Sequence, residues 1–380
     1  MNKQNRAAHG GDWMGFETEY GKAPLDFSMN VNPFGMPEGV AKAIAGAAPL
    51  AFRYPDPECR RLRKALSERE KVPEEWILCG NGAADIIDRI ALALRSQPGH
   101  ALVTAPTFSE YGQALRRCGW SVDRWPLKAE EGFALKEDIL RALDGPKKPD
   151  ILFLCEPNNP TGVTTDRGLL ERIIGACREA GTFLVIDECF HEFLDEPAEH
   201  TMKDFLAEHP NLILLRAFTK FFGMAGVRLG YCLCSSPEIL EKLRQAGQPW
   251  NVSLLAEEAG LAALGEEGWA ERTRQLIQQE RAWLRQKLEE LGARNVLGEA
   301  NYLLFLWPGE GAEARPGEGA GDKGRESLAD KLRRRGILIR SADNYEGLGR
   351  GWYRTAVRTR EENRQLIAAL EEIREDKQNG

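Results

Sequence analysis

One lysine lies where a covalent reaction with an aldehyde is chemically reasonable. Lys220 stands between the apolar, strand-like run 212–217 and a glycine-bearing turn, and Arg228 follows eight positions later. A lysine in a desolvated pocket loses part of its preference for the charged state, and the neutral amine can then condense with an aldehyde to form a Schiff base. The sequence therefore marks Lys220 as a candidate catalytic residue and Arg228 as a candidate ligand for a phosphate group.

A second apolar run ends on a carboxylate. Residues 182–187 read Thr-Phe-Leu-Val-Ile-Asp. Buried parallel strands read as continuous apolar runs, and ligands of open parallel sheets bind beyond the carboxyl ends of the strands, so Asp187 is expected to face a site. An aspartate can keep the pyridine nitrogen of pyridoxal phosphate protonated, which that cofactor's chemistry requires. Taken alone, Asp187 could equally cap the turn that follows it.

A third apolar run, 150–155, leads into the turn Glu-Pro-Asn-Asn-Pro-Thr-Gly at 156–162. Asn159 in this turn could donate a hydrogen bond to the phenolic oxygen of the same cofactor. Such residues are common in turns for backbone reasons alone. It is less common for such a turn to be followed along the chain by a strand that ends in aspartate and then by a lysine and an arginine. Together these motifs resemble the class I and II aminotransferases, which are fold-type I pyridoxal-phosphate enzymes, over nearly the whole chain.

The resemblance implies a role for each of these motif residues. Lys220 would carry the Schiff base, and Asp187 would face the pyridine nitrogen. Asn159 would contact the phenolic oxygen, and Arg228 would bind the cofactor phosphate. A non-catalytic descendant of the family would be expected to lack Lys220 or Asp187, and both are present.

Further cofactor ligands follow from the same resemblance. Gly82 and Ala83 match the phosphate cradle, where backbone amides at a helix start meet the anion. Phe108 matches the aromatic ring that stacks on the pyridine, although a ring at this position could also belong to the core. Tyr54 matches a tyrosine that reaches the phosphate in the neighbouring subunit, which implies a homodimer with shared active sites.

Two positions depart from the family pattern. Many relatives have a tyrosine three residues after the aspartate, whereas this chain has Phe190, so a second hydrogen bond to the phenolic oxygen is expected to be absent. Three residues before the lysine, relatives usually have a serine or threonine, and this chain has Ala217. Either Thr219 supplies the hydroxyl, or the phosphate binds with one donor fewer.

Two groups within the family fit the motifs, namely the threonine-phosphate decarboxylases of cobalamin side-chain assembly and the histidinol-phosphate aminotransferases. The segments that resemble the first group more closely are 9–11, 25–35, 248–253, 337–349 and 353–360, together with Phe190. This resemblance implies decarboxylation of O-phospho-L-threonine or O-phospho-L-serine. The alternative is transamination with 2-oxoglutarate, and no spacing argument separates the two.

A substrate with a carboxylate and a phosphate group needs cationic residues to bind it. Arg354 matches the position that binds the substrate's α-carboxylate, and a guanidinium suits this task because its planar fork meets two oxygens at once. A phosphorylated amino acid needs a second cationic clamp, for which His9, Arg340 and Arg358 are candidates. Asn32 is a candidate neutral donor near the amino acid. For each of these residues a structural or surface contact is the alternative, especially for His9 in the N-terminal segment.

Composition limits the class of protein. The chain has 380 residues, 42% of them hydrophobic, which is the ordinary globular range. A formal net charge of −7 disfavours nonspecific nucleic-acid binding. The eight cysteines lack metal-ligand spacing, so no metal is expected. The polar N-terminus has no apolar stretch long enough for a signal peptide or a membrane span, so a cytoplasmic protein without a membrane partner is expected.

The hydrophobic pattern predicts an α/β protein. Strand-like runs alternate with amphipathic helices from about 78 to 233, as in a parallel sheet with helices on both faces. A long charged helix near 267–291, strands at 302–307 and 337–340 and a helix from 360 follow. The resemblance implies a mainly parallel seven-stranded sheet and a smaller α+β domain. The expected organisation is an N-terminal segment 1–50 packed on the small domain, a cofactor-binding domain 51–250 and a small domain 251–380 with a flexible insertion at 308–324.

Overall fold

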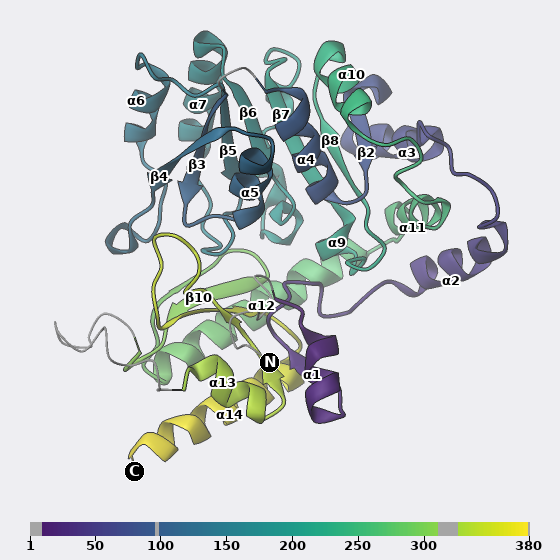
Figure 1. Ribbon diagram of the computed structural model, residues 1–380. Coiled ribbons are helices and arrows are strands. Elements are labelled where there is room, and N and C mark those ends of the chain that lie inside the picture. The colour runs from purple at the N-terminus through teal and green to yellow at the C-terminus, as the bar shows by residue number, and fades with distance from the viewer. Residues whose placement is uncertain (1–9, 96–98, 311–325, 379–380) are drawn as a thin grey trace.

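The computed structural model describes residues 10–95, 99–310 and 326–378 (Figure 1). His9 and most of the predicted insertion at 308–324 lie outside these residues. The largest element is a seven-stranded sheet in the order β2-β8-β7-β6-β5-β3-β4. Its strands are β2 (Ile77–Gly80), β3 (His100–Ala105), β4 (Ser121–Pro126), β5 (Ile151–Cys155), β6 (Phe183–Asp187), β7 (Leu212–Ala217) and β8 (Gly230–Leu233). Only β8 runs antiparallel to its neighbours, which confirms the mainly parallel sheet.

Continuous apolar strands form this sheet because both of its faces are covered. Successive side chains of a strand point to opposite faces. On β5, Leu152 and Leu154 pack in the same core as α7 (Arg167–Ala180). Ile151 and Phe153 pack instead in the core that contains α4 (Ala83–Ala93), α5 (Ser109–Arg117) and α10 (Pro237–Ala246). The central strands therefore have no polar face, whereas the edge strand β4 is largely exposed.

A second, antiparallel sheet has the order β12-β13-β10-β9. Its strands are β9 (Arg294–Leu297), β10 (Tyr302–Leu306), β12 (Arg340–Ser341) and β13 (Trp352–Ala356), and it lies with α12 (Trp269–Glu290), α13 (Leu328–Arg334) and α14 (Arg360–Gln378) below the large sheet in Figure 1. The remaining α-helices are α1 (Trp13–Tyr20), α2 (Glu38–Ala47), α3 (Arg60–Glu70), α6 (Leu140–Leu143), α8 (Pro197–His200), α9 (Phe218–Phe221) and α11 (Leu254–Leu264).

The strand predicted at 337–340 is divided between two sheets. β11 (Ile337–Leu338) pairs in parallel with β1 (Leu25–Asp26), whereas β12 pairs with β13. Arg340 therefore belongs to the four-stranded antiparallel sheet, and β1 joins the N-terminal segment to β11 in a separate two-stranded sheet. Over the described parts of the chain, none of the helices has both the length and the apolar character that crossing a membrane requires.

Candidate active site

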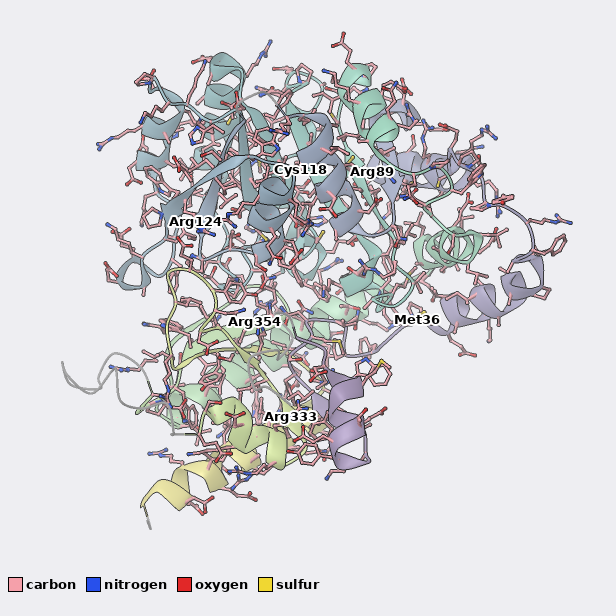
Figure 2. The ribbon with its side chains drawn as sticks, viewed as in Figure 1. Met36, Arg89, Cys118, Arg124, Arg333 and Arg354 are labelled. Atoms are coloured by element: carbon pink, nitrogen blue, oxygen red, sulfur yellow. The ribbon has the colours of Figure 1, made fainter. Side chains whose placement is uncertain are left out.

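A cavity of about 470 Å³ lies beyond the carboxyl ends of the parallel strands. In Figure 2, Arg354, one of its lining residues, lies between the large sheet and the helices below it. Five parallel strands, β2, β3, β5, β6 and β7, each end at a lining residue or lead into one within four positions, as expected for an open parallel sheet. Of the residues predicted from the sequence, the cavity is lined by Ala83, Phe108, Asn159, Asp187, Thr219, Lys220, Arg228, Arg340 and Arg354.

Lys220 lies in the single turn of α9, directly after β7. Burial, and after it the guanidinium of Arg354, lower the pKa of the Lys220 amine from 10.5 to about 8. Its Nζ lies 5.8 Å from the ring centroid of Phe190, the residue at which relatives carry a tyrosine. A neutral, nucleophilic amine is therefore accessible near neutral pH, in a place where the aromatic neighbour offers no hydroxyl.

Asp187 ends β6 and is held by two donors. The hydroxyl of Tyr111 donates to Oδ2 at 2.6 Å, and the backbone N–H of Cys189 donates to Oδ1 at 2.9 Å. Burial, and the neighbouring Asp187, raise the pKa of Tyr111 well above its usual value, so this phenol stays a donor. Sequence reasoning missed Tyr111; its position three residues after Phe108, on the first turn of the same helix, was the available signal.

The N-terminus of α4 forms a cradle for an anion. Gly82 precedes the helix with φ 80°, and no side chain caps the first amides. A Cβ at Gly82 would lie 2.7 Å from Nη2 of Arg228, so only glycine lets the guanidinium approach the helix start. Free amides at a helix start and an adjacent guanidinium suit a phosphate. Together with the Lys220 amine and the Asp187 carboxylate, these residues fit the pyridoxal phosphate expected from the sequence.

Arg354 on β13 is buried and lines the same cavity as the cradle residues Ala83 and Arg228. Its Nη1 donates to Oδ1 of Asn159 at 2.5 Å, and its Nη2 donates to the carbonyl of Ser28 at 2.9 Å. Nε has no partner among the described residues. Because the oxygen of Asn159 is occupied, its Nδ2 is the atom available to a phenolic oxygen.

Arg340 stands opposite Arg354 in the antiparallel pair β12–β13. Directly opposed residues of such a pair point to the same face, so both guanidiniums reach one cavity. Arg340 also donates to Oδ1 of Asn344 at 2.8 Å and lies over the ring of Tyr345 at 5.6 Å. The cavity thus contains two cations from one hairpin.

The prediction for Asn32 is wrong. Its Nδ2 donates to the carbonyl of Phe221 at 2.8 Å and to Oγ1 of Thr273 at 2.9 Å, and its Oδ1 accepts from the N–H of Phe34 at 3.0 Å. The side chain does not line the cavity. All of its hydrogen-bonding atoms are used to fix the turn that follows Lys220, so it cannot serve as a substrate donor.

Arg358, a predicted clamp for the substrate phosphate, does not line the cavity. Its guanidinium pairs with Glu362 at 2.5 Å and donates to the carbonyl of Asp26 at 3.2 Å, away from the cavity lining. Tyr54 lies outside the cavity of its own chain, 81% exposed, with its ring 4.9 Å from that of Trp250. The contact of Tyr54 with a neighbouring subunit stays a prediction.

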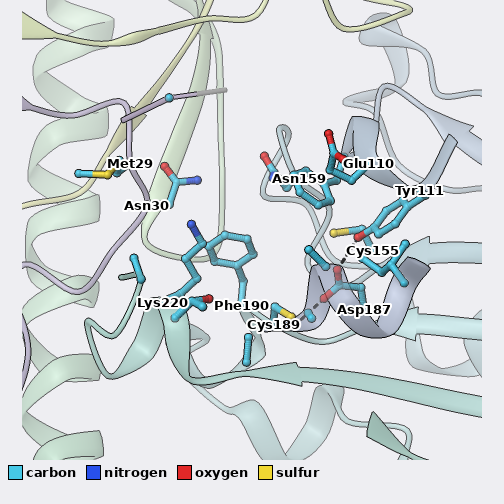
Figure 3. Close-up of a pocket in the computed structure, with 18 of the residues that line it drawn as sticks. Met29, Asn30, Glu110, Tyr111, Cys155, Asn159, Asp187, Cys189, Phe190 and Lys220 are labelled. Carbon is cyan, nitrogen blue, oxygen red and sulfur yellow. Dashed lines mark hydrogen bonds between the residues drawn. The ribbon is translucent and has the colours of Figure 1, made fainter. Parts of the chain in front are cut away.

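Asn30 is a lining residue that sequence reasoning did not single out. Its side chain is 1% exposed, and neither amide atom has a hydrogen-bond partner among the described residues. In Figure 3 it lies with Lys220 on one side of the cavity, facing the space that Asp187 and Asn159 border from the other side. A buried amide without a partner is costly, which points to a ligand that completes its hydrogen bonds.

Comparisons with known proteins agree with this geometry. The family model described as aminotransferase class I and II matches residues 22–370. Threonine-phosphate decarboxylase of Salmonella typhimurium is 37% identical over 373 residues, covering 97% of this chain and 96% of that protein. Histidinol-phosphate aminotransferase 1 of Cupriavidus pinatubonensis is 32% identical over 348 residues, covering 91% and 87%. The crystal structure of the histidinol-phosphate aminotransferase from Clostridium acetobutylicum has a TM-score of 0.82 at 28% identity, covering 93% and 99%.

Proposed function

This chain belongs to the aminotransferase class I and II family, and we propose that it decarboxylates O-phospho-L-threonine or O-phospho-L-serine. Its cofactor is pyridoxal 5′-phosphate. The products would be carbon dioxide and (R)-1-aminopropan-2-yl phosphate or ethanolamine phosphate, either of which could supply the nucleotide loop of cobalamin. The similarity to the Salmonella decarboxylase over 97% of the chain supports this reading.

The observation that carries the proposal is the pair Arg340 and Arg354. Two guanidiniums from opposed positions of one hairpin line the same cavity. Arg354 is buried and Arg340 is partly buried, and a cavity lined by guanidiniums attracts anionic groups of a ligand. A substrate with both a carboxylate and a phosphate supplies two anionic groups, whereas an unphosphorylated neutral amino acid supplies one.

We assign the roles as follows. Pyridoxal 5′-phosphate, when bound, acts as an electron sink for the bond that breaks at the substrate's α-carbon. Arg354 binds the substrate carboxylate and sets its orientation, and Arg340 binds the phosphate. Asn30 donates to or accepts from the substrate, which satisfies its buried amide. Lys220, whose pKa of about 8 leaves it mostly protonated at neutral pH, delivers from Nζ the proton that replaces carbon dioxide on the α-carbon.

The alternative is an aminotransferase for histidinol phosphate or a related amino acid with 2-oxoglutarate or glutamate. The similarity to the enzymes of Cupriavidus and Clostridium supports it. In that reaction the neutral Lys220 amine would remove the α-proton instead of delivering one. The same pKa of about 8 serves both directions of proton transfer. For a substrate with an α-carboxylate, the orientation that Arg354 sets decides between the two reactions, whereas histidinol phosphate has no carboxylate to lose.

The test is turnover without a keto acid. The cofactor-loaded protein is incubated with O-phospho-L-threonine, and carbon dioxide and aminopropanol phosphate are measured, with Lys220→Ala as the inactive control. Product formation supports decarboxylation. Absence of product, followed by activity on histidinol phosphate once 2-oxoglutarate is added, would establish the aminotransferase instead.

We further propose a homodimer in which Tyr54 reaches the partner's cavity. Phe52 and Tyr54 are 80% and 81% exposed, and the ring of Tyr54 contacts that of Trp250, itself 47% exposed, in a tilted arrangement. An aromatic surface therefore lies open on one chain. Mixing the inactive variants Lys220→Ala and Tyr54→Ala tests shared sites. Reassociation should restore roughly a quarter of the sites, because half of the dimers are mixed and each holds one intact site. No recovery in dimers shown to have exchanged subunits would contradict the proposal.

A further inference from the structure

A second cavity, of about 190 Å³, adjoins the active-site cavity. The two cavities share three lining residues, Phe108, Arg340 and Tyr345. The second cavity lies between β3, β4, α5 and the hairpin loop 342–351, and we call it the vestibule. The loop crosses to the large sheet, where a Cβ at Gly347 would lie 3.3 Å from Pro106. A group that moves from the vestibule to the active site would pass Arg340.

The charged lining of the vestibule is mainly cationic. Arg116 on α5, Arg124 on β4 and Arg340 on β12 contribute guanidiniums, and Glu346 on the loop contributes the one carboxylate of the lining. The chain as a whole has a formal charge of −7, so three arginines make the lining of this small cavity more positive than the protein as a whole. Clefts lined by one sign of charge concentrate ligands of the opposite sign.

The three arginines differ in their partners. Arg124, labelled on β4 in Figure 2, forms an ion pair with Glu346. Arg340 donates to Asn344. Arg116 has no carboxylate within ion-pair distance among the described residues, and a Cβ at Gly112, which also lines the vestibule, would lie 3.2 Å from its Nη1. The guanidinium thus lies over its own helix at the vestibule and carries an unbalanced charge.

We propose that the vestibule is an anion subsite that receives the phosphate monoester of the incoming substrate before Arg340 binds it in the active site. The proposal rests on the proposed function, which requires a phosphorylated substrate. Arg116 supplies the uncompensated charge, and Arg124 becomes available when the phosphate competes with Glu346. That competition is easy because the ion pair is partly exposed, with the Arg124 and Glu346 side chains 32% and 57% exposed, and exposed pairs are weak.

Steady-state kinetics with Arg116→Gln test the subsite. Its control is Arg117→Gln, the same change on the next residue, whose guanidinium points instead to Asp88 of α4 at 2.5 Å. For the phosphorylated substrate, Arg116→Gln should lower kcat/KM about 3- to 10-fold at low ionic strength, with the loss falling in KM. The loss should shrink to less than about twofold near 0.5 M salt, because ions screen exposed charges. Arg117→Gln should lose little at either salt concentration.

Binding of inorganic phosphate to the cofactor-loaded protein tests the anion subsite independently of the proposed function. Phosphorus NMR line broadening should report weaker binding of inorganic phosphate to Arg116→Gln than to Arg117→Gln. That result would support the subsite even if the enzyme proved to be an aminotransferase. Equal phosphate binding by the two variants, or an equal loss of kcat/KM for substrates with and without a phosphate, would overturn the subsite while leaving decarboxylation intact.

Discussion

The hydroxyl of Tyr111 donates a 2.6 Å hydrogen bond to Oδ2 of Asp187, so an α5 side chain fixes the carboxylate at the end of β6. Both residues are buried, and the other carboxylate oxygen is held by the N–H of Cys189. Tyr111→Phe leaves a buried carboxylate oxygen with one donor fewer. The free energy of unfolding should fall by about 1–2 kcal/mol, and kcat should fall on the order of tenfold because Asp187 is no longer held in one orientation.

A matched control is available in the same sheet. Tyr231 on β8 also donates to a carboxylate at 2.6 Å, in this case that of Glu70, and is buried. Tyr231 does not line the active-site cavity. Chemical denaturation should show a similar loss of stability for Tyr231→Phe, while its kcat should stay near that of the wild type. Equal losses of kcat in the two variants would mean that Tyr111 acts only through stability.

Asn30 and Asn32 should respond in opposite ways to the same substitution. Asn30→Ala removes a buried amide that has no partner, so the stability of the substrate-free protein should stay constant or rise by about 1 kcal/mol. Asn32→Ala removes three hydrogen bonds and should lower stability by about 2 kcal/mol or more. KM for the phosphorylated substrate should rise roughly tenfold for Asn30→Ala. Thermal unfolding measures the stability of each variant, and steady-state kinetics measure KM. A clear loss of stability in Asn30→Ala would show that the Asn30 amide already has a partner.

The lowered pKa of Lys220 predicts a pH dependence for cofactor attachment. Only the neutral amine attacks an aldehyde, so the rate at which cofactor-free protein takes up pyridoxal phosphate should rise with pH and reach half its maximum near pH 8. Arg354 is the second cause of the lowered pKa, so Arg354→Leu should move the midpoint to higher pH. Arg358→Leu, which removes a guanidinium away from the cavity lining, should leave it unchanged. Stopped-flow absorbance follows the reaction, and an unshifted midpoint in Arg354→Leu would contradict the electrostatic explanation.

The same lysine makes stability depend on pH. Between the native pKa of about 8 and the unfolded value near 10.5, the unfolded chain binds a proton that the native chain lacks. The free energy of unfolding of the cofactor-free protein should therefore rise with pH across this window, by up to about 3 kcal/mol. Lys220→Met lacks the titrating group. Denaturation at about pH 7.5 and 9.5 should show a smaller pH-dependent gain in Lys220→Met than in the wild type, and an identical gain would place the titration elsewhere.

The sequence predicted the large sheet well because its signal is local. Buried parallel strands such as 151–155 and 183–187 are continuous apolar runs, and the polar residue after each run marks the ligand edge of the sheet. The cavity residues that follow these strands were therefore accessible from the sequence. The strand at 337–340 was predicted less well, because whether one run pairs with one sheet or with two depends on distant partners, here β1 and β13.

The two asparagines of the N-terminal segment show what local reasoning lacks. Asn30 and Asn32 are two residues apart in an extended motif, and the sequence favoured the second as the substrate donor. Their difference depends on Phe221 and Thr273, about 190 and 240 residues away, which satisfy Asn32 and leave Asn30 unpaired. Hydrogen-bond satisfaction is a tertiary property, and no spacing rule contains it.

Gly82 should be required by the phosphate cradle for a steric reason beyond its backbone angle. A Cβ at this position would lie 2.7 Å from Nη2 of Arg228, so Gly82→Ala must displace the guanidinium from the start of α4. With φ 80° and ψ 164°, the backbone at Gly82 lies in a region that essentially only glycine adopts, so any L-residue adds strain on the order of 1–3 kcal/mol. Affinity for pyridoxal phosphate should fall at least about tenfold, because a charge-assisted contact to the phosphate is lost.

Gly181→Ala separates the two effects. Gly181 ends α7 with φ 70°, and a Cβ there would meet nothing within 4 Å, so the substitution brings backbone strain without a clash. Chemical denaturation should show a loss of about 1–2 kcal/mol for Gly181→Ala, which is in the left-handed helical region, and a loss on the order of 1–3 kcal/mol for Gly82→Ala. Only Gly82→Ala should lose cofactor affinity in equilibrium dialysis, because only there does the added methyl group compete with Arg228 for space. If Gly181→Ala loses cofactor affinity to the same extent, the cradle depends on overall stability and not on the close approach of Arg228.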